Sequence, residues 1–466
     1  MTLTEIQRAL TTLDTKPRQS LGQNFLHDQN LARWIVARLG LHAGDHVVEI
    51  GPGLGALTEH LLSEDITVTL IEKDRSMVAW LAERFRDSRV ELFHMDALDF
   101  DLRNLYGKGP VKIIGNLPYY VSTPLIAKFA SALSPASILV LTLQHEVAAR
   151  LHAQPGTKDF GAMSVCSSRR WNVRYVKKLP ASVFFPQPKV SSAVVVFERK
   201  AAETIPPCDE IVFESLVRRG FSERRKQLRN LLPEFKERWS SLCADLGLSE
   251  TVRAEELSLA TWEKFTRSVN PVEAQRAEEM FDIVDENDSV LGLRPRKEVH
   301  VNNLRHRAVH ILITNEKGEL FLQKRSIWKD RNPACWDSSA AGHVDTGETY
   351  EEAARRELGE EIGIDCPVTK IGRLPCSPET GCEFIEVFQG RHEGPFRLAS
   401  LEVETGAFFP REQVLAWLQR SPADFSPVFA QCLPFLGGAR GDSSRLSGTQ
   451  ISACAPVPVS QAKSGA

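Results

Sequence analysis

Apolar runs alternate with amphipathic stretches along the first 200 residues. The runs HVVEI at 46–50, TVTLIE at 67–72 and VELFHMD at 90–96 have the length and composition of buried strands. Between them, ALTEHLL and SMVAWLAERF carry apolar residues at helical spacing. Strands that alternate with helices in this way predict a doubly wound α/β sheet over residues 1–200, with helices on both faces.

The pattern changes after residue 200. Residues 201–270 have helical periodicity without strand signals, which predicts a small helical lobe. Asn270 and Pro271 precede a short charged stretch, so residues 271–280 are predicted to be a linker. A strand-rich pattern begins near Met280 and predicts a second α/β domain over 281–436. The tail, 437–466, is rich in Gly, Ser, Ala and Pro and is predicted to have no fixed structure.

Length and composition agree with a multidomain globular protein. A chain of 466 residues is longer than one hydrophobic core supports. No apolar run is long enough to span a bilayer, and the first residues lack the apolar core of a signal peptide. The nine cysteines are odd in number and form no CxxC pair. These features predict a cytoplasmic protein with reduced thiols and no membrane partner.

A glycine-rich turn, EIGPGLG at 49–55, directly follows the first apolar strand. Such a turn lets the backbone approach a ligand closely, although a dinucleotide site or a plain structural turn fits it equally well. Two carboxylates add to the pattern. Glu72 ends the next strand, where it can accept hydrogen bonds from ribose hydroxyls, and Asp96 ends the third, where it can accept from an adenine amino group.

Asn116, Leu117, Pro118 and Tyr119 follow the strand VKIIG at the carboxyl edge of the predicted sheet. An exocyclic adenine amine is a poor nucleophile because its lone pair is delocalised into the ring. An amide oxygen and a backbone carbonyl fixed by proline can accept its two N–H bonds and aim the lone pair at a methyl donor. Tyr119 can stack on the base. The motif therefore predicts methylation of an adenine amine without a general base.

Over residues 17–268 the sequence closely resembles the KsgA/RsmA family of ribosomal RNA adenine dimethyltransferases. The matching stretches are GQNFL at 22–26, EIGPGLGALT, NLPYYVSTPL, FPQPKVSSAVV and SERRKQLRNLL. The resemblance implies a Rossmann-like sheet that binds S-adenosylmethionine. The residues that it implies as donor contacts are Asn24, Leu26, Gly51, Glu72, Asp96 and Asn116.

The same resemblance implies the substrate. Two adjacent adenosines in a loop near the 3′ end of small-subunit (16S) rRNA, in the immature 30S subunit, would each receive two methyl groups. Asn116, Leu117, Pro118 and Tyr119 would form the catalytic motif. Phe184 lies where the family carries an aromatic residue that sandwiches the target base against the tyrosine.

Two basic clusters fit an RNA partner, although either alone would fit a solvated surface. Basic residues outnumber acidic ones up to residue 270, and the balance reverses after it. The first cluster comprises Arg169, Arg170, Arg174, Lys177, Lys178 and Lys189, and the second comprises Arg218, Arg219, Arg224, Arg225, Lys226 and Arg229. With a base-binding motif nearby, we expect these residues to contact RNA phosphates.

The second domain carries Gly342-x5-Glu348-x7-Arg356-Glu357-Leu358-x-Glu360-Glu361-x-Gly363-Ile364, which fills the pattern of Nudix hydrolases and implies their α/β/α fold. Glu357, Glu360 and Glu361 are spaced to share one helix face. Clustered carboxylates repel one another unless cations compensate, and oxygen ligands select Mg2+ or Mn2+. Such ions can bind a small-molecule diphosphate and activate water. Glu402 or Glu404 is a candidate further ligand.

Around this motif, FDIVDENDSVLG, LRHRAVHILI and FLQKRS resemble the isopentenyl-diphosphate-isomerase-like branch of Nudix proteins. In that resemblance Ala341 takes the position of the isomerase's catalytic cysteine. We therefore predict hydrolysis of a diphosphate and not isomerisation.

Two other functions also fit the sequence. The chain could be a ribosome-assembly binding factor with an inert Nudix-like appendage, or the first part could be a mitochondrial-type transcription factor built on the same fold. The complete motifs favour a methyltransferase with a second, hydrolytic activity.

Overall fold

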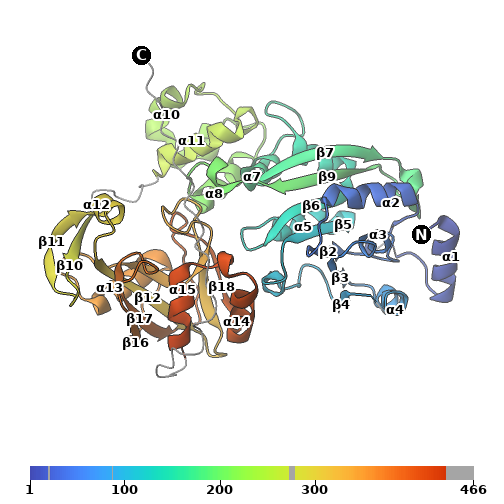
Figure 1. The fold of residues 1–466 in the computed structure, drawn as a ribbon. Coiled ribbons are helices and arrows are strands. Elements are labelled where there is room, and N and C mark those ends of the chain that lie inside the picture. Colours follow the sequence, from blue (N-terminus) through green and yellow to red (C-terminus); the bar gives the residue numbers. More distant parts are fainter. Residues whose placement is uncertain (19–20, 87, 272–278, 437–466) are drawn as a thin grey trace, which may run out of the picture. The chain divides into compact units, whose positions relative to one another are not determined.

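The computed structural model describes residues 1–18, 21–86, 88–271 and 279–436 (Figure 1). The chain divides into two compact units. The first contains residues 1–274 together with 326–328 and 400–405, and the second contains 275–325, 329–399 and 406–466.

The first unit is built on a seven-stranded sheet with the order β4-β3-β2-β5-β6-β9-β7. Strands β4 to β6 in this order are parallel, and β9 runs antiparallel to both of its neighbours. The strands are β2 (His46–Ile50), β3 (Thr67–Glu72), β4 (Val90–His94), β5 (Val111–Asn116), β6 (Ala136–Gln144), β7 (Trp171–Leu179) and β9 (Ser192–Arg199). A separate short pair joins β1 (Phe25–Leu26) to β8 (Phe184–Phe185).

The central strands are apolar because both faces of the sheet are covered. All five residues of β2 are buried, and so are the first five of β5. Val48 and Ile113 belong to one core cluster, whereas Val47 and Ile114 belong to another. Alternate residues of a strand point to opposite faces, so these two clusters form the layers on the two sides of the sheet.

Helices connect the strands and complete the first unit. Those around the sheet are α1 (Leu3–Thr12), α2 (Gln29–Val36), α3 (Thr58–Leu61), α4 (Arg75–Arg84), α5 (Ser122–Phe129), α6 (His145–His152) and α7 (Ala162–Arg170). The predicted helical lobe contains α8 (Glu210–Gly220), α9 (Leu228–Leu231), α10 (Trp239–Leu246) and α11 (Leu259–Val269). These four helices share a core of their own that includes Phe213, Trp239, Trp262 and Phe265.

The second unit contains a seven-stranded mixed sheet. Its main path is β14-β13-β12-β17-β16, with β15 paired to β12 and β18 to β13, and β12 is parallel to β17. The strands are β12 (His306–Thr314), β13 (Leu320–Arg325), β14 (Trp336–Asp337), β15 (Ala340–His343), β16 (Val368–Leu374), β17 (Glu383–Arg391) and β18 (Val403–Phe409). A hairpin of β10 (Met280–Val284) and β11 (Val290–Pro295) precedes this sheet.

Within residues 279–436, the α-helices that accompany these strands are α12 (Arg296–Val301), α13 (Tyr350–Glu361), α14 (Arg411–Arg420) and α15 (Pro427–Cys432). The start of α13 is fixed by a capping box, in which the Thr349 hydroxyl accepts from the N–H of Glu352 and the Glu352 carboxylate accepts from the N–H of Thr349. Ala353, Ala354 and Leu358 then pack into the core of the unit. The face of α13 that carries Glu357 and Glu361 is thereby turned inward.

The predicted α/β fold of both domains is confirmed, with a Rossmann-like parallel region in the first sheet. The domain limits 1–200, 201–270 and 281–436 stay predictions. Most of the predicted linker, at 272–278, and the predicted unstructured tail, 437–466, lie outside the described residues. Within the described part of the chain, no helix is long and apolar enough to cross a membrane.

Candidate active sites

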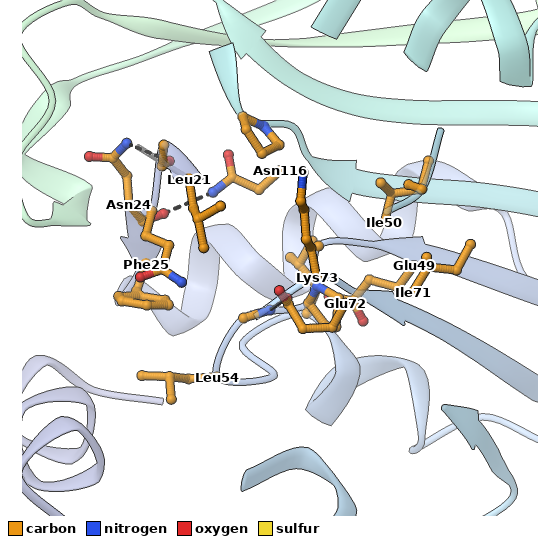
Figure 2. Close-up of a pocket in the computed structure, with 18 of the residues that line it drawn as sticks. Leu21, Asn24, Phe25, Glu49, Ile50, Leu54, Ile71, Glu72, Lys73 and Asn116 are labelled. Carbon is orange, nitrogen blue, oxygen red and sulfur yellow. Dashed lines mark hydrogen bonds between the residues drawn. The ribbon is translucent and has the colours of Figure 1, made fainter. Parts of the chain in front are cut away.

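A cavity opens at the carboxyl edge of β2, β3 and β5, with about 1000 Å³ of free space including open solvent at its mouth. This is the edge where ligands bind in open α/β sheets, and the size suits a nucleoside-sized ligand. The residues that line it and were predicted to bind the methyl donor are Asn24, Leu26, Gly51, Glu72, Asp96 and Asn116. Other lining residues include Gln23, Phe25, Glu49, Lys73 and Pro118 (Figure 2).

The glycine turn holds one wall of this cavity. Gly51 and Gly53 both have positive φ, 65° and 58°, a conformation that favours glycine. The N–H of Gly53 donates to Oε2 of Glu72 at 3.0 Å, and the N–H of Asp74 donates to Oε1 at 2.8 Å. Backbone groups thus fix the Glu72 carboxylate, while each oxygen keeps a lone pair that can face a ligand.

Asp96 and Lys73 form a polar corner of the cavity. Nζ of Lys73 lies 2.6 Å from Oδ2 of Asp96, and Oδ1 accepts from the N–H of Leu98 at 2.9 Å. Partial burial raises the pKa of Asp96, but the hydrogen bonds from Lys73 and Leu98 outweigh it and lower the pKa overall. Asp96 is therefore an ionised acceptor at neutral pH.

Glu49 lines the same cavity and is almost fully buried. Its Oε2 accepts from the Thr58 hydroxyl at 2.6 Å. Burial raises the pKa of Glu49 to about 8, against the effect of this hydrogen bond, and the nearby Glu72 raises it further. Glu49 is consequently protonated at neutral pH unless a positive charge enters the cavity.

Asn116 and Asn24 meet at the cavity wall. Nδ2 of Asn116, at the end of β5, donates to the backbone oxygen of Asn24 at 2.9 Å, and Nδ2 of Asn24 donates to the backbone oxygen of Gly22 at 3.0 Å (Figure 2). Since a carbonyl only accepts, the amide of Asn116 must present its nitrogen to Asn24. Its oxygen remains the acceptor for a substrate amine.

Two other predicted catalytic residues, Leu117 and Phe184, are not among the residues that line the cavity. Leu117 is buried in one core layer, and its N–H donates to the backbone oxygen of Thr142 at 3.1 Å. Phe184, opposite Leu26 in the β1–β8 pair, is only 4% exposed and packs in the other core layer. The side chain of Tyr119 lies outside the described part of the structure, so its stacking role, like that of Phe184, stays a prediction.

The second unit carries a carboxylate site on α13. Glu357 and Glu361 are buried, whereas the side chain of Glu360 is 61% exposed. Oε2 of Glu361 accepts from Nε2 of Gln323 at 2.8 Å and from the N–H of Ala341 at 2.9 Å. A side chain at Gly342 would have no room, because its Cβ would lie 2.0 Å from Oε1 of Glu357. The glycine therefore lets β15 pack directly on the two carboxylates.

Arg356 connects the carboxylates of this site through its guanidinium group. Arg356 donates to Glu348 at 3.0 Å, to Glu357 at 2.7 Å and to Glu360 at 3.1 Å. It also donates to the backbone oxygen of His343 at 2.8 Å. This guanidinium therefore holds the three carboxylates and the end of β15 in one arrangement.

The carboxylate site fits a divalent cation. Burial raises the pKa of Glu357 to about 8, and the charge of Glu361 adds to this, despite the contact with Arg356. Oε1 of Gln323, beside Glu361, is buried and has no hydrogen-bond partner among the described residues. Lys329 lies 3.3 Å from Oε1 of Glu361, so with Arg356 two cations face the four carboxylates Glu348, Glu357, Glu360 and Glu361. An Mg2+ or Mn2+ ion would compensate the remaining negative charge and supply a partner for the Gln323 oxygen.

Comparison with protein families decides the relationship of the first unit. Residues 14–270, more than half of the chain, match the model of the ribosomal RNA adenine dimethylase family. The chain belongs to this family. Residues 304–429 match the NUDIX domain model, so the chain joins an adenine dimethylase domain to a NUDIX domain. The more specific resemblance to the isopentenyl-diphosphate-isomerase-like branch stays a prediction.

Individual relatives cover the dimethylase domain. Ribosomal RNA small subunit methyltransferase A of Chlorobium luteolum is 38% identical over 257 residues, which are 55% of this chain and 91% of the relative. The protein of the same name from Prosthecochloris aestuarii is 38% identical over 272 residues, 58% and 100% of the two chains. A solved dimethyladenosine transferase from Plasmodium falciparum is 22% identical and covers 53% of this chain and 97% of its own, with a TM-score of 0.45.

Several features of the two domains were not predicted, or were predicted wrongly, from the sequence. Glu49 and Lys73 line the cavity but were not singled out, although each adjoins a residue or turn that was. Arg169, predicted to face RNA, is 2% exposed and pairs with Glu263 at 2.9 Å, so that prediction is wrong. The partner carboxylate, Glu263, belongs to α11, so the local sequence around Arg169 does not reveal it. Arg169 is buried because this ion pair compensates its charge.

Other members of the basic clusters are exposed, and the two candidates for a further carboxylate ligand lie in one segment. Lys177, Lys178, Lys189, Arg225 and Arg229 are exposed on the dimethylase domain. Glu402 and Glu404 fall in the segment 400–405, which groups with the first unit. Glu404 is nearly buried and forms an ion pair with Arg170 of the first basic cluster. A role of Glu402 or Glu404 in the carboxylate site stays a prediction.

Gly342→Ala should destabilise the NUDIX domain by about 1–3 kcal/mol, because the new methyl group displaces the Glu357 carboxylate. Gly359→Ala, within α13, is the matched control: its Cβ meets nothing within 4 Å, and alanine should stabilise the helix by about 0.5–1 kcal/mol. Denaturant unfolding of both variants measures the difference. Equal stability of the two would show that Gly342 is not tightly packed.

Glu49→Gln should flatten the dependence of stability on pH. Burial raises the folded pKa of Glu49 from 4.5 to about 8, so between these values the folded state binds a proton that the unfolded state releases. This contribution is fully present below about pH 4.5 and is lost as pH rises through about 8. The melting temperature of the variant should therefore fall less between about pH 6 and about pH 9 than that of the wild type. The exposed control Glu64→Gln should show the same dependence of melting temperature on pH as the wild type. The same dependence in Glu49→Gln would contradict the raised pKa of Glu49.

Proposed function

We propose that the dimethylase domain transfers methyl groups from S-adenosylmethionine to the N6 atoms of two adjacent adenosines. These adenosines lie in a loop near the 3′ end of small-subunit rRNA in the immature 30S subunit. The observation that carries this proposal is that the predicted donor-binding residues line one cavity and Asn116 is among them. The relatives named small subunit methyltransferase A support the choice of RNA.

The donor supplies an electrophilic methyl group on a sulfonium. In the proposed complex, the fixed Glu72 carboxylate accepts the ribose hydroxyls, since Gly53 and Asp74 already hold its orientation. Asp96, ionised beside Lys73, accepts the amino group of the donor's adenine. The positive charge of the donor favours the ionised form of Glu49, which lines the cavity. Binding near neutral pH is then accompanied by release of a proton from Glu49.

The acceptor amine is held by oxygen atoms at the end of β5. Oδ1 of Asn116 accepts one N–H, and the carbonyl of Pro118 accepts the other with the lone pair that Val121 does not use. These hydrogen bonds favour pyramidal geometry at nitrogen and direct its lone pair toward the methyl group. The proton leaves after transfer, so the site needs no strong base.

RNA affinity comes from the exposed lysines of the first basic cluster. Lys177 and Lys178 extend from β7, and Lys189 lies in the loop between β8 and β9. Contacts between such side chains and phosphates add affinity without selecting sequence. Selection of the adenosine falls to the pocket, and a loop base is favoured because extracting a paired base costs a few kcal/mol.

The NUDIX domain is proposed to hydrolyse a small-molecule diphosphate with Mg2+ or Mn2+. Glu357 and Glu361 would hold the ion on the buried face of α13, and Glu360 would contribute from its exposed edge. The ion would bind the diphosphate and activate water. Ala341, whose N–H donates to Glu361, carries no exchangeable side-chain proton, which disfavours isomerisation of isopentenyl diphosphate.

Asn116→Ala should lower the rate of methyl transfer by about 100- to 1000-fold, the usual effect of removing one preorganised hydrogen-bonding group. Donor binding should be substantially retained, because the Asn116 amide acts mainly on the amine. Single-turnover methylation of unmethylated small subunits and calorimetry of donor binding separate these effects. Asn104→Ala, on the surface, serves as the control. A normal transfer rate in the Asn116 variant would remove the proposed role.

Glu361→Gln should lower Mg2+-dependent hydrolysis by about 100-fold, because the side chain keeps its hydrogen bonds to Gln323 and Ala341 but loses a ligand charge. Phosphate release from a panel of nucleoside and isoprenoid diphosphates measures this. Glu351→Gln, exposed in the first turn of α13, should keep full activity. If the wild type turns over no member of the panel, the NUDIX domain is an inert appendage.

A further inference from the structure

A tryptophan on α2 brings two cations together on one face of the dimethylase domain. The guanidinium carbon of Arg38, in the short 3-10 helix Ala37–Leu39, lies 4.8 Å from the centre of the Trp34 ring. Nζ of Lys177, on β7, lies 5.1 Å from the same centre. Both cations are attracted by the negative face of the indole, so one ring holds two charges from elements distant in sequence.

A β-bulge directs Lys177 to this face. The register of β7 against β9 shifts just before Lys177, because one extra residue, Val176, is inserted in the strand. Lys177 then lies opposite Val194, in the core layer that α2 covers, whereas Lys178 lies opposite Ala193 in the other layer. Without the extra residue, Lys177 would point to the other face of the sheet, away from α2.

The protein itself does not neutralise these two charges. In the part of the chain that the structure describes, neither Arg38 nor Lys177 forms an ion pair with a carboxylate. The second basic cluster differs, because glutamates pair with Arg218, Arg219, Arg224 and Lys226. Neighbouring charges of one sign repel, and a partner that carries negative charge relieves this repulsion. The face around Trp34 is therefore suited to an anionic partner.

The position of this face in the fold relates it to the donor cavity. α2 follows β1 and β7 leads into β8, and these two short strands pair with each other (Figure 1). Leu26 of β1 lines the cavity and lies opposite Phe184 of β8. Trp34 is five residues beyond the first residue of α2, or about 8 Å along the helix. The two cations are thus placed for the backbone of nucleotides near an adenosine that enters the cavity.

We propose that Arg38, Trp34 and Lys177 form a phosphate clamp for the rRNA backbone beside the target adenosine. This inference rests on the proposed methylation of rRNA and adds a contact surface to it. The two cations bind phosphates of one strand, and the ring orders both side chains before the RNA arrives. A long side chain that is free in solvent loses rotamer freedom when it binds, and Trp34 reduces this loss. Trp34 is thus a positioning residue.

The test uses the full chain and small ribosomal subunits that lack the modification, with affinity measured over a series of salt concentrations. Arg38→Gln and Lys177→Gln should each weaken binding about three- to sixfold at about 0.15 M salt, the effect of losing one phosphate contact. Each should also lower the slope of log affinity against log salt by about one. Since neither residue lines the donor cavity, the KM for subunits should rise by the same factor and kcat should stay unchanged. Arg89→Gln, an exposed arginine paired with Asp65, is the control and should bind as the wild type does.

Variants of the ring test its positioning role. Trp34→Leu should weaken binding, because leucine still covers the core but no longer holds the cations. Trp34→Phe keeps an aromatic face and should recover most of the loss. In the Trp34→Leu chain, Lys177→Gln should cost less affinity than in the wild type. Lys178→Gln, on the other face of the sheet, should cost the same in both chains.

Three results would overturn the proposal. The first is that the Arg38 and Lys177 variants bind and methylate subunits as Arg89→Gln does. The second is a Trp34→Leu chain with a lower melting temperature but normal affinity, which would mean that the ring only packs α2 against β7. The third is a loss of affinity for intact subunits but not for a protein-free transcript of the 3′ segment of the rRNA, which would assign the cations to an acidic ribosomal protein. Methylation by the wild type in the same assays tests the proposed function separately.

Discussion

A buried carboxylate that accepts backbone N–H groups from a neighbouring segment is the interaction on which both domains depend. In the dimethylase domain Glu72 accepts from Gly53 and Asp74, and in the NUDIX domain Glu361 accepts from Ala341. Burying an ionised group costs free energy unless such hydrogen bonds offset it. These hydrogen bonds therefore fix both the carboxylates and the backbone segments that donate to them.

This constraint explains the glycines that frame each site. Gly51 and Gly53 take positive φ in the turn that directs the N–H of Gly53 at Glu72, and Gly342 leaves space for the Glu357 carboxylate. The same packing raises the pKa of Glu49 and of Glu357, since each lies beside another carboxylate away from water. Buried carboxylates of this kind suit a positively charged group, which in our proposal is a sulfonium donor in the first domain and a metal ion in the second.

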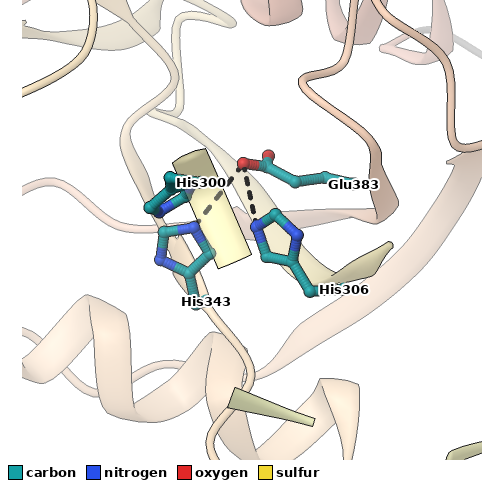
Figure 3. A group of neighbouring side chains, drawn as sticks. All are labelled: His300, His306, His343 and Glu383. Atoms are coloured by element: carbon teal, nitrogen blue, oxygen red, sulfur yellow. Dashed lines mark ion pairs between the residues drawn. The ribbon is translucent and has the colours of Figure 1, made fainter. Parts of the chain in front are cut away.

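Sequence patterns predicted the parts of this arrangement that are local. The order of strands and helices, the glycine turn and the carboxylates at strand ends all follow from periodicity and from the rule that parallel strands end at one edge. Contacts between distant segments were not predictable in this way. These contacts depend on which elements become neighbours in the fold. Examples are the ion pair of Lys73 with Asp96, the buried ion pair of Arg169 with Glu263, and the pairing of Phe184 with Leu26 between β8 and β1. The convergence of His300, His306, His343 and Glu383 from four elements of the second unit is the extreme case (Figure 3).

The most direct test of the account is to identify the methylated product. The wild-type chain would be incubated with S-adenosylmethionine and small ribosomal subunits that lack the modification, and the rRNA would be digested and mapped by mass spectrometry. The account predicts N6,N6-dimethyladenosine at two adjacent positions in a loop near the 3′ end. A chain that binds the donor but leaves these adenosines unmodified, or that methylates a different nucleotide, would contradict it.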